Sequence, residues 1–221
     1  MTAKHMVRIF HPEIKGKLPF VVVNSGHGEA DDLYDLTKSL TNKDFVLIMV
    51  ETENWNDDLS PWKAEAVFPN GAPFEGHADQ YLDSLLNEIL PDCEERLKEE
   101  GIIPSSYILA GYSLAGLFAL YAATQTDRFH RIVSASGSLW YPGFEEFMEK
   151  ERISDNTDLI YLSLGDKEAN TRHPLMSQVE KKTASLAKKL PVETYYELNP
   201  GDHFTDPDLR LAKGISYVLN K

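Results

Sequence analysis

The chain has 221 residues, of which 42% are hydrophobic and 26% are charged, as in ordinary globular proteins. Its formal net charge of −13, from 22 basic and 35 acidic side chains, argues against nucleic acid or an anionic membrane surface as the main partner. The length fits a single domain over residues 1–221.

The N-terminal segment has no apolar run of signal-peptide length, and the longest apolar runs, such as residues 20–23 and 45–50, are too short to cross a bilayer. Cys93 is the only cysteine, so no intramolecular disulfide can form. It lies in a charged helical stretch, where a packing role is favoured over a reactive one. We therefore expect a cytoplasmic protein, and the oligomeric state is left open.

Short apolar runs rich in β-branched residues recur along the chain and predict strands. They are residues 5–11, 20–24, 45–50, 106–110, 131–136, 158–164 and 192–198. Helical patterns lie between them, at residues 32–40, 77–100, 114–124, 144–150, 174–190 and 207–219. This alternation predicts an α/β fold with a mostly parallel central sheet and helices on both faces. The first two strands are expected to be antiparallel to each other.

The connection at residues 51–75 shows no periodicity and contains three prolines. Loops of this length inside a compact domain are commonly functional. Its aromatic residues Trp55, Trp62, Phe68 and Phe74 either line a pocket or pack on one another in a surface loop. The sequence leaves both readings open.

The strand at residues 106–110 runs into Gly111-Tyr112-Ser113-Leu114-Ala115-Gly116, which opens the next helix. A serine flanked by small residues, after a strand and before an apolar helix, is typical of a nucleophile elbow, a tight turn that holds the hydroxyl above the sheet. Ala115 stands where the common G-x-S-x-G pattern has its second glycine, and its side chain is small enough to preserve the turn. Ser113 is therefore the candidate nucleophile.

A nucleophilic serine needs a base, and in this arrangement the partners follow in the order serine, acid, histidine. His203 follows the last strand, whereas His130 precedes a strand and His173 lies within a loop, so His203 is the candidate base. Two carboxylates, Asp166 and Glu168, follow the penultimate strand. Glu168 is favoured as the acid because the third residue of such a turn usually points back to the sheet edge, and Asp166 is the alternative.

The oxyanion of a tetrahedral intermediate needs N–H donors that are already in place. One is expected from the backbone of Leu114, and the second from the loop after the second strand, at Gly26 or His27. That loop lacks the third glycine of a dinucleotide fingerprint, and no histidine or cysteine cluster has metal spacing. Neither a cofactor nor a metal is expected.

Five motifs in order along the chain resemble the Putative esterase family of α/β-hydrolases, which includes esterase D, feruloyl esterases and siderophore esterases. They are GYSLAG, TENWNDDLSPW, SASGSLWYP, LSLGDKE and NPGDHF. The resemblance implies an α/β-hydrolase fold, Ser113 as nucleophile, His203 as base and an acid after Gly165. Glu168 would stand where aspartate is commoner in the family.

The same resemblance implies that Trp55, Trp62 and Trp140 lie near the substrate, and Tyr112 is expected to contact the substrate too. Together these residues predict a cofactor-free serine hydrolase that cleaves a small-molecule carboxylic ester through an acyl-enzyme on Ser113. Two alternatives remain: an acyltransferase of the same fold, and a catalytically silent binding module. Substrates differ across such folds, so the acyl group and the leaving alcohol or thiol are left open.

Overall fold

The computed structural model describes residues 6–26, 32–68 and 70–221, and within them the strands form a seven-stranded sheet in the order β1-β3-β2-β4-β5-β6-β7. The strands are β1 (Val7–Phe10), β2 (Gly16–Ser25), β3 (Val46–Glu51), β4 (Ile102–Tyr112), β5 (Arg131–Ala135), β6 (Leu159–Gly165) and β7 (Glu193–Asn199). All neighbours from β3 to β7 pair in parallel, and only β1 is antiparallel to its neighbour. The predicted mostly parallel α/β sheet is confirmed.

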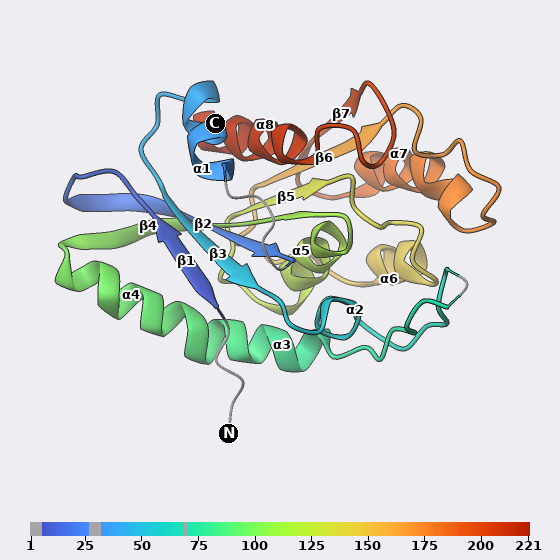
Figure 1. Ribbon diagram of the computed structural model, residues 1–221, viewed down its shortest axis with the longest axis horizontal. Coiled ribbons are helices and arrows are strands. Elements are labelled where there is room, and N and C mark those ends of the chain that lie inside the picture. The colour runs from blue at the N-terminus through green and yellow to red at the C-terminus, as the bar shows by residue number, and fades with distance from the viewer. Residues whose placement is uncertain (1–5, 27–31, 69) are drawn as a thin grey trace.

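Helices cover both faces of this sheet (Figure 1). One face carries α1 (Leu33–Leu40) and α8 (Pro207–Asn220). The other carries α3 (Ala78–Ser84), α4 (Leu90–Glu99), α5 (Leu114–Gln125), α6 (Phe144–Lys150) and α7 (Val179–Lys189). None of the described helices is both long and apolar enough to span a membrane.

The first strand has a different partner from the one that chain order suggests. β1 pairs with β3, with Val7 opposite Val50, so β3 lies between β1 and β2. Because β3 is parallel to β2, the first two strands do run in opposite directions, but they do not form a hairpin.

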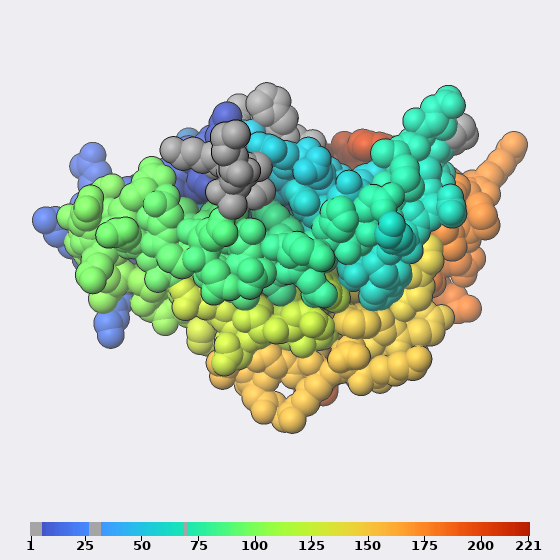
Figure 2. All heavy atoms as spheres, turned by 90° about the horizontal axis from the view of Figure 1, so that it is seen from below, coloured from blue at the N-terminus to red at the C-terminus, as the bar shows by residue number. Residues whose placement is uncertain are grey.

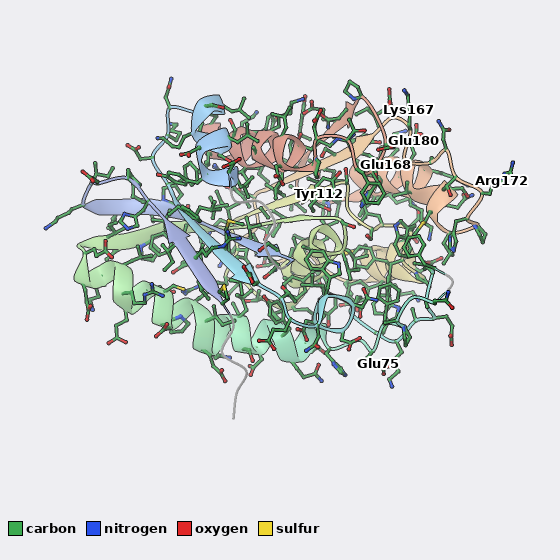
Figure 3. All side chains as sticks on the ribbon, viewed as in Figure 1. Glu75, Tyr112, Lys167, Glu168, Arg172 and Glu180 are labelled. Atoms are coloured by element: carbon green, nitrogen blue, oxygen red, sulfur yellow. The ribbon has the colours of Figure 1, made fainter. Side chains whose placement is uncertain are left out.

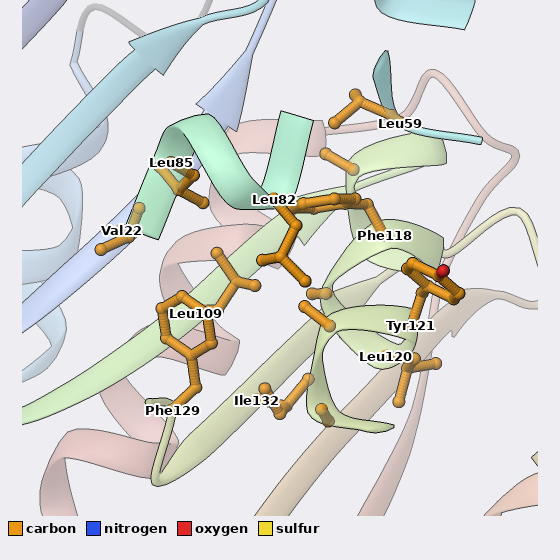
Figure 4. Close-up of a cluster of buried hydrophobic side chains, with 14 of the residues drawn as sticks. Val22, Leu59, Leu82, Leu85, Leu109, Phe118, Leu120, Tyr121, Phe129 and Ile132 are labelled. Carbon is orange, nitrogen blue, oxygen red and sulfur yellow. The ribbon is translucent and has the colours of Figure 1, made fainter. Parts of the chain in front are cut away.

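The central strands read as unbroken apolar runs because both of their faces are covered. In β2, Phe20 and Val22 point into the cluster beneath α3–α5, while Val21 and Val23 point into the cluster beneath α1 and α8. Helix α5 is buried almost all round, which explains why its sequence shows no polar face. Figure 4 shows Phe118 of α5 and Leu109 of β4 within the first cluster.

The predicted helix at residues 77–100 is divided by a π-helical turn, η1 (Leu85–Ile89), between α3 and α4. Pro91 stands in the first turn of α4, and a proline in a helix lacks an N–H and crowds the carbonyl four residues before it, which favours such a widened turn.

The loop at residues 51–75 contains a short helix, α2 (Trp55–Asp58). The segment before α3, in teal, projects from one end of the molecule (Figure 2). A 3₁₀ turn, η2 (Met176–Gln178), precedes α7.

Candidate active site

Ser113 lies in a sharp turn between β4 and α5, at the carboxyl edge of the sheet. Its backbone has φ 57° and ψ −121°, an unfavourable conformation for a residue with a side chain. The turn brings strand and helix so close that a Cβ on Gly111 would lie 2.3 Å from the carbonyl carbon of Ala115, and one on Gly116 would lie 2.9 Å from the Ser134 hydroxyl. The small residues around Ser113 are therefore required by the close crossing of strand and helix.

His203 lies in the turn after β7 and faces Ser113. Its Nε2 is 3.0 Å from Ser113 Oγ, and its Nδ1 is 2.8 Å from Glu168 Oε2. An ionised carboxylate can only accept, so Nδ1 carries the proton and Nε2 accepts from the serine hydroxyl. The hydroxyl of Tyr112 donates to the His203 carbonyl oxygen at 2.7 Å and holds this turn against the end of β4.

Glu168 lies in the turn after β6, and its side chain is only 4% exposed. Its Oε1 accepts from the Ser136 hydroxyl and from the Gly165 N–H, both at 2.7 Å. Burial acts to raise the pKa of this carboxyl, but the hydrogen bond and charge of His203, with the bonds from Ser136 and Gly165, outweigh burial and hold the pKa below its usual value. Glu168 is thus ionised and points at His203.

Arg210, on the first turns of α8, supplies the counter-charge to Glu168. Its side chain is 2% exposed, and its Nη1 lies 3.0 Å from Glu168 Oε1. Its Nη2 donates to the Pro200 carbonyl at 2.9 Å, and Nη1 also reaches the hydroxyls of Ser136 and Tyr112. A buried charge needs such partners, and here one guanidinium joins α8 to the end of β4 and to the turns after β5, β6 and β7.

Asp166, the alternative acid, has a different place. Its Oδ1 accepts the Gly201 N–H at 2.8 Å, and this bond ties the turn after β6 to the turn after β7. Gly201 has φ 101°, which suits glycine, and a Cβ there would lie 2.5 Å from the Thr205 hydroxyl. The structure therefore brings Glu168, rather than Asp166, to the imidazole. Figure 3 shows Glu168 and Tyr112 at this edge of the sheet.

The expected oxyanion donors are described only in part. Leu114 is the first residue of α5, so its N–H has no acceptor within the helix and lies directly beside Ser113. Gly26 follows the last residue of β2 at the same edge of the sheet. His27 lies outside the described residues.

Two cavities meet at Ser113. The first, of about 430 Å³, is lined by residues from β2, α8 and the His203 turn, and the second, of about 140 Å³, by residues from the 51–75 segment and the turn after β5. Trp55 lines both cavities and Trp140 lines the second, while Tyr112 lines the first.

Trp62 lines neither cavity, contrary to its expected place near the substrate. Its Nε1 donates to the Pro142 carbonyl at 2.9 Å, and its ring packs against Tyr141, Phe144 and Phe147. An aromatic residue in a long loop gains as much from packing as from a pocket, and here packing determines its position.

The other histidines after Ser113 lie elsewhere. His130 contacts the Tyr107 N–H, at the start of β5 and away from the carboxyl edge. His173 lies in the loop before α7, where its Nδ1 faces the Met176 N–H.

Three contributors were missed from the sequence: Ser136, Ser138 and Arg210. Ser138 Oγ lies 3.4 Å from Ser113 Oγ, and its N–H donates to the Ser113 carbonyl at 2.9 Å. The run of serines at the end of β5 was the available signal, since Ser136 and Ser138 contact the acid and the nucleophile respectively. Arg210 gave no signal, because an arginine on an amphipathic helix usually faces solvent.

A hydroxyl bonded to an imidazole that is itself bonded to a buried carboxylate can be deprotonated as it attacks an electrophilic carbon. In the described part of the chain, no group of three or more histidine, cysteine, aspartate or glutamate side chains is placed to hold a metal ion.

A family model described as Putative esterase matches residues 1–206. A protein of Bacillus subtilis (strain 168), described as uncharacterized protein YbbA, is 27% identical in an alignment of 187 residues that covers 82% of this chain and 74% of that one. The match thus extends over most of the length of both chains.

Solved structures with the same architecture are more distant in sequence. An IroE-like serine hydrolase from Shewanella oneidensis has a TM-score of 0.81 at 19% identity, covering 98% of this chain and 76% of that one. The siderophore hydrolase EstA from Aspergillus nidulans has a TM-score of 0.73 at 17% identity, covering 98% and 90%. The enterobactin esterase FES from Shigella flexneri has a TM-score of 0.73 at 18% identity, covering 98% and 55%. At these identities the likeness concerns the fold, which is of the α/β-hydrolase type.

Proposed function

The chain belongs to the Putative esterase family, and from that premise we propose that it is a serine hydrolase that cleaves carboxylic esters through an acyl-enzyme on Ser113. The observation that carries the proposal is the line of contacts from Ser113 Oγ to His203 Nε2, at 3.0 Å, and from His203 Nδ1 to Glu168 Oε2, at 2.8 Å. These are hydrogen-bond distances at which a proton can pass from the hydroxyl to the imidazole.

In the first half of the reaction, Ser113 Oγ forms a bond to the ester carbonyl carbon while its proton moves to His203 Nε2. The carbonyl oxygen becomes an oxyanion, which accepts the Leu114 N–H and a second donor from the segment after β2. The intermediate then collapses: the bond from carbon to the alkoxy oxygen breaks, and His203 returns the proton to that oxygen, which leaves as the alcohol.

In the second half, a water molecule gives a proton to His203 Nε2 as its oxygen attacks the acyl carbon. Collapse of the second intermediate breaks the bond to Ser113 Oγ, which takes the proton back, and the carboxylic acid departs. Glu168 stays ionised throughout, because its carboxylate stabilises the imidazolium that forms in each half and fixes the ring orientation. No proton passes to Glu168.

The named relatives support an ester as the scissile group. Two of the solved structures are described as a siderophore hydrolase and an enterobactin esterase, and the family itself is described as an esterase family. We carry over to this chain the cleavage of an ester bond and not those particular substrates, because substrate choice depends on pocket residues that differ between such distant chains.

A serine-reactive fluorophosphonate probe tests the proposal and separates an enzyme from a silent binding module. The wild-type protein should be labelled stoichiometrically at Ser113, and Ser113→Ala should not be labelled. Labelling should block turnover of p-nitrophenyl acetate in proportion to occupancy. An unlabelled, correctly folded wild-type protein with no turnover would favour the binding module instead.

The same assay run with added alcohol distinguishes hydrolysis from acyl transfer. A hydrolase releases carboxylic acid as its main product, whereas a transferase forms the new ester in preference to acid. We expect acid as the main product at millimolar alcohol concentrations.

A further inference from the structure

The two cavities meet at Ser113 but differ in their relation to His203. The larger one is lined by both Ser113 and His203, together with Phe204 and Tyr112. The smaller one is lined by Ser113, Leu114, Ser138 and aromatic residues, and His203 does not contribute to it. A substrate carbonyl bonded to Ser113 Oγ therefore has two different volumes available for its two substituents.

The position of His203 decides which substituent goes where. In ester cleavage the imidazolium must hand its proton to the leaving oxygen, so that oxygen has to lie within hydrogen-bond reach of His203 Nε2. The alcohol portion consequently extends into the cavity that His203 lines. The acyl portion, which never receives that proton, extends into the other cavity.

The volumes differ about threefold, at about 430 Å³ on the His203 side and about 140 Å³ on the acyl side. An apolar cavity of roughly 150 Å³ in another protein holds one benzene molecule. The acyl cavity thus encloses about the volume of one six-membered ring, whereas the larger cavity lies within the range of ordinary ligand sites.

Both cavities carry an unusually exposed aromatic ring. Phe204 is 84% exposed and Phe68 is 61% exposed, the highest values among the large hydrophobic residues that the structure describes. Phe204 lies edge-on to the His203 ring on the alcohol side, while Phe68 lines the acyl side. Covering such an exposed ring with a ligand removes apolar surface from water and so favours binding. Each ring therefore marks the apolar mouth of its cavity.

We propose that the preferred substrate is an ester of a compact, apolar acyl group, up to about one ring in size, with a larger apolar alcohol that contacts Phe204. This assignment rests on the proposed ester cleavage at Ser113. The small acyl cavity favours a compact acid, and the larger cavity favours the larger alcohol.

Two isomeric esters provide a direct test, because they differ only in which side carries the larger ring. They are 2-naphthylmethyl benzoate and benzyl 2-naphthoate, with benzyl benzoate as reference. The isomers have similar intrinsic reactivity, so kcat/KM reports the fit. We expect 2-naphthylmethyl benzoate to be cleaved at least about tenfold faster than benzyl 2-naphthoate, the range that one misplaced apolar group commands. Equal rates, or faster cleavage of the naphthoate, would overturn the assignment.

Matched substitutions assign the two sides. Phe204→Ala should lower kcat/KM for 2-naphthylmethyl benzoate relative to benzyl benzoate by about tenfold. It should not change kcat/KM for benzyl 2-naphthoate relative to benzyl benzoate. Phe68→Ala should raise kcat/KM for benzyl 2-naphthoate relative to benzyl benzoate. It should not change kcat/KM for 2-naphthylmethyl benzoate relative to benzyl benzoate. Ile103→Ala removes another exposed hydrophobic side chain, at the end of β4 remote from Ser113, and serves as the control for both. Opposite responses of the two phenylalanine variants would reverse the assignment.

Fluorophosphonate labelling distinguishes failure of the cavity assignment from failure of the proposed function. If fluorophosphonate labels Ser113 but the two isomers react equally, the cavity assignment fails and the serine-hydrolase proposal stands. If Ser113 takes no label and no ester is cleaved, both fail.

Discussion

Arg210→Met removes the cation buried behind Glu168 and keeps most of the side-chain volume. Glu168 and Arg210 are only 4% and 2% exposed, so the variant leaves a carboxylate in a site that water does not reach. Breaking a buried pair by removing one partner costs about 3–5 kcal/mol. The lost bond to the Pro200 carbonyl adds to that cost. The melting temperature should fall by roughly 10 °C, given about 2–4 °C per kcal/mol for a chain of this size.

The same change should alter catalysis through Glu168, because Arg210 touches the carboxylate oxygen Oε1 and not the reacting groups. A small shift of Glu168 moves His203, and a misplacement of about 1 Å can cost about 10²-fold in rate. We expect the loss mainly in kcat rather than KM, since Arg210 itself lines neither of the two cavities at Ser113. Arg210→Lys keeps the charge without the forked geometry and should restore part of the rate.

The pH dependence separates this positioning role from a merely structural one. Glu168 has a depressed pKa, so its ionised form contributes stability above the unfolded value of about 4.5, and that contribution is lost as pH falls through the lower folded value. Removing the neighbouring guanidinium raises the pKa of Glu168. Activity and stability of Arg210→Met should therefore begin to fall at a higher pH than in the wild type.

Thermal unfolding by circular dichroism, and kcat/KM measured from acid to neutral pH, check both effects. In a double-mutant cycle, Arg210→Met combined with Glu168→Gln should be less damaging than the sum of the single changes by at least about 1 kcal/mol. An Arg210→Met protein with an unchanged melting temperature and an unshifted acid limb would show that Arg210 neither stabilises nor positions Glu168.

Three further predictions concern single side chains. Glu168→Gln should lower kcat by about 10⁴-fold, whereas Asp166→Asn, which alters only the hydrogen bond to Gly201, should keep kcat within about tenfold of wild type. Turnover per fluorophosphonate-titrated site measures both variants. An inactive Asp166→Asn together with an active Glu168→Gln would reverse the acid assignment. Cys93 is 1% exposed and burial raises the pKa of its thiol to about 11, so Ellman's reagent should react only after denaturant is added; rapid reaction of the native protein would contradict that burial. Trp62→Ala should lower the free energy of unfolding by about 3 kcal/mol without changing the relative rates at which small-acyl and aryl esters are cleaved. A change in those relative rates at constant melting temperature would place Trp62 in the substrate site after all.

The sheet and the elbow could be predicted because local sequence carries their causes. Strand β4 and helix α5 are covered on both sides, so their residues read as one apolar run, and the close crossing admits only small residues at Gly111 and Ala115. The order of Ser113, an acid and His203 follows from the order in which parallel strands reach one edge. Their assignment to catalytic roles remains a prediction.

What sequence could not supply depends on contacts between distant segments. Arg210 reads as a solvated helix residue, and only the packing of α8 beside the turn after β6 turns it into the buried partner of Glu168. Trp55 and Trp62 occur in the same loop, and their local sequences do not distinguish them. Trp62 nevertheless packs on Tyr141, whereas Trp55 lines both cavities. The sequence also could not supply the partner of β1, because a four-residue strand carries too little pattern to choose between β2 and β3.

If Ser113 is the nucleophile, it carries the acyl group during turnover, and that acyl-enzyme can be trapped. The enzyme is mixed with p-nitrophenyl acetate, quenched in acid within the first turnover, digested and analysed by mass spectrometry. We expect the mass of one acetyl group on the peptide that carries Ser113, in an amount equal to the burst of nitrophenol, and its absence from Ser113→Ala. Full turnover with no acetylated Ser113, or acetyl on another residue at the same stoichiometry, would contradict this expectation.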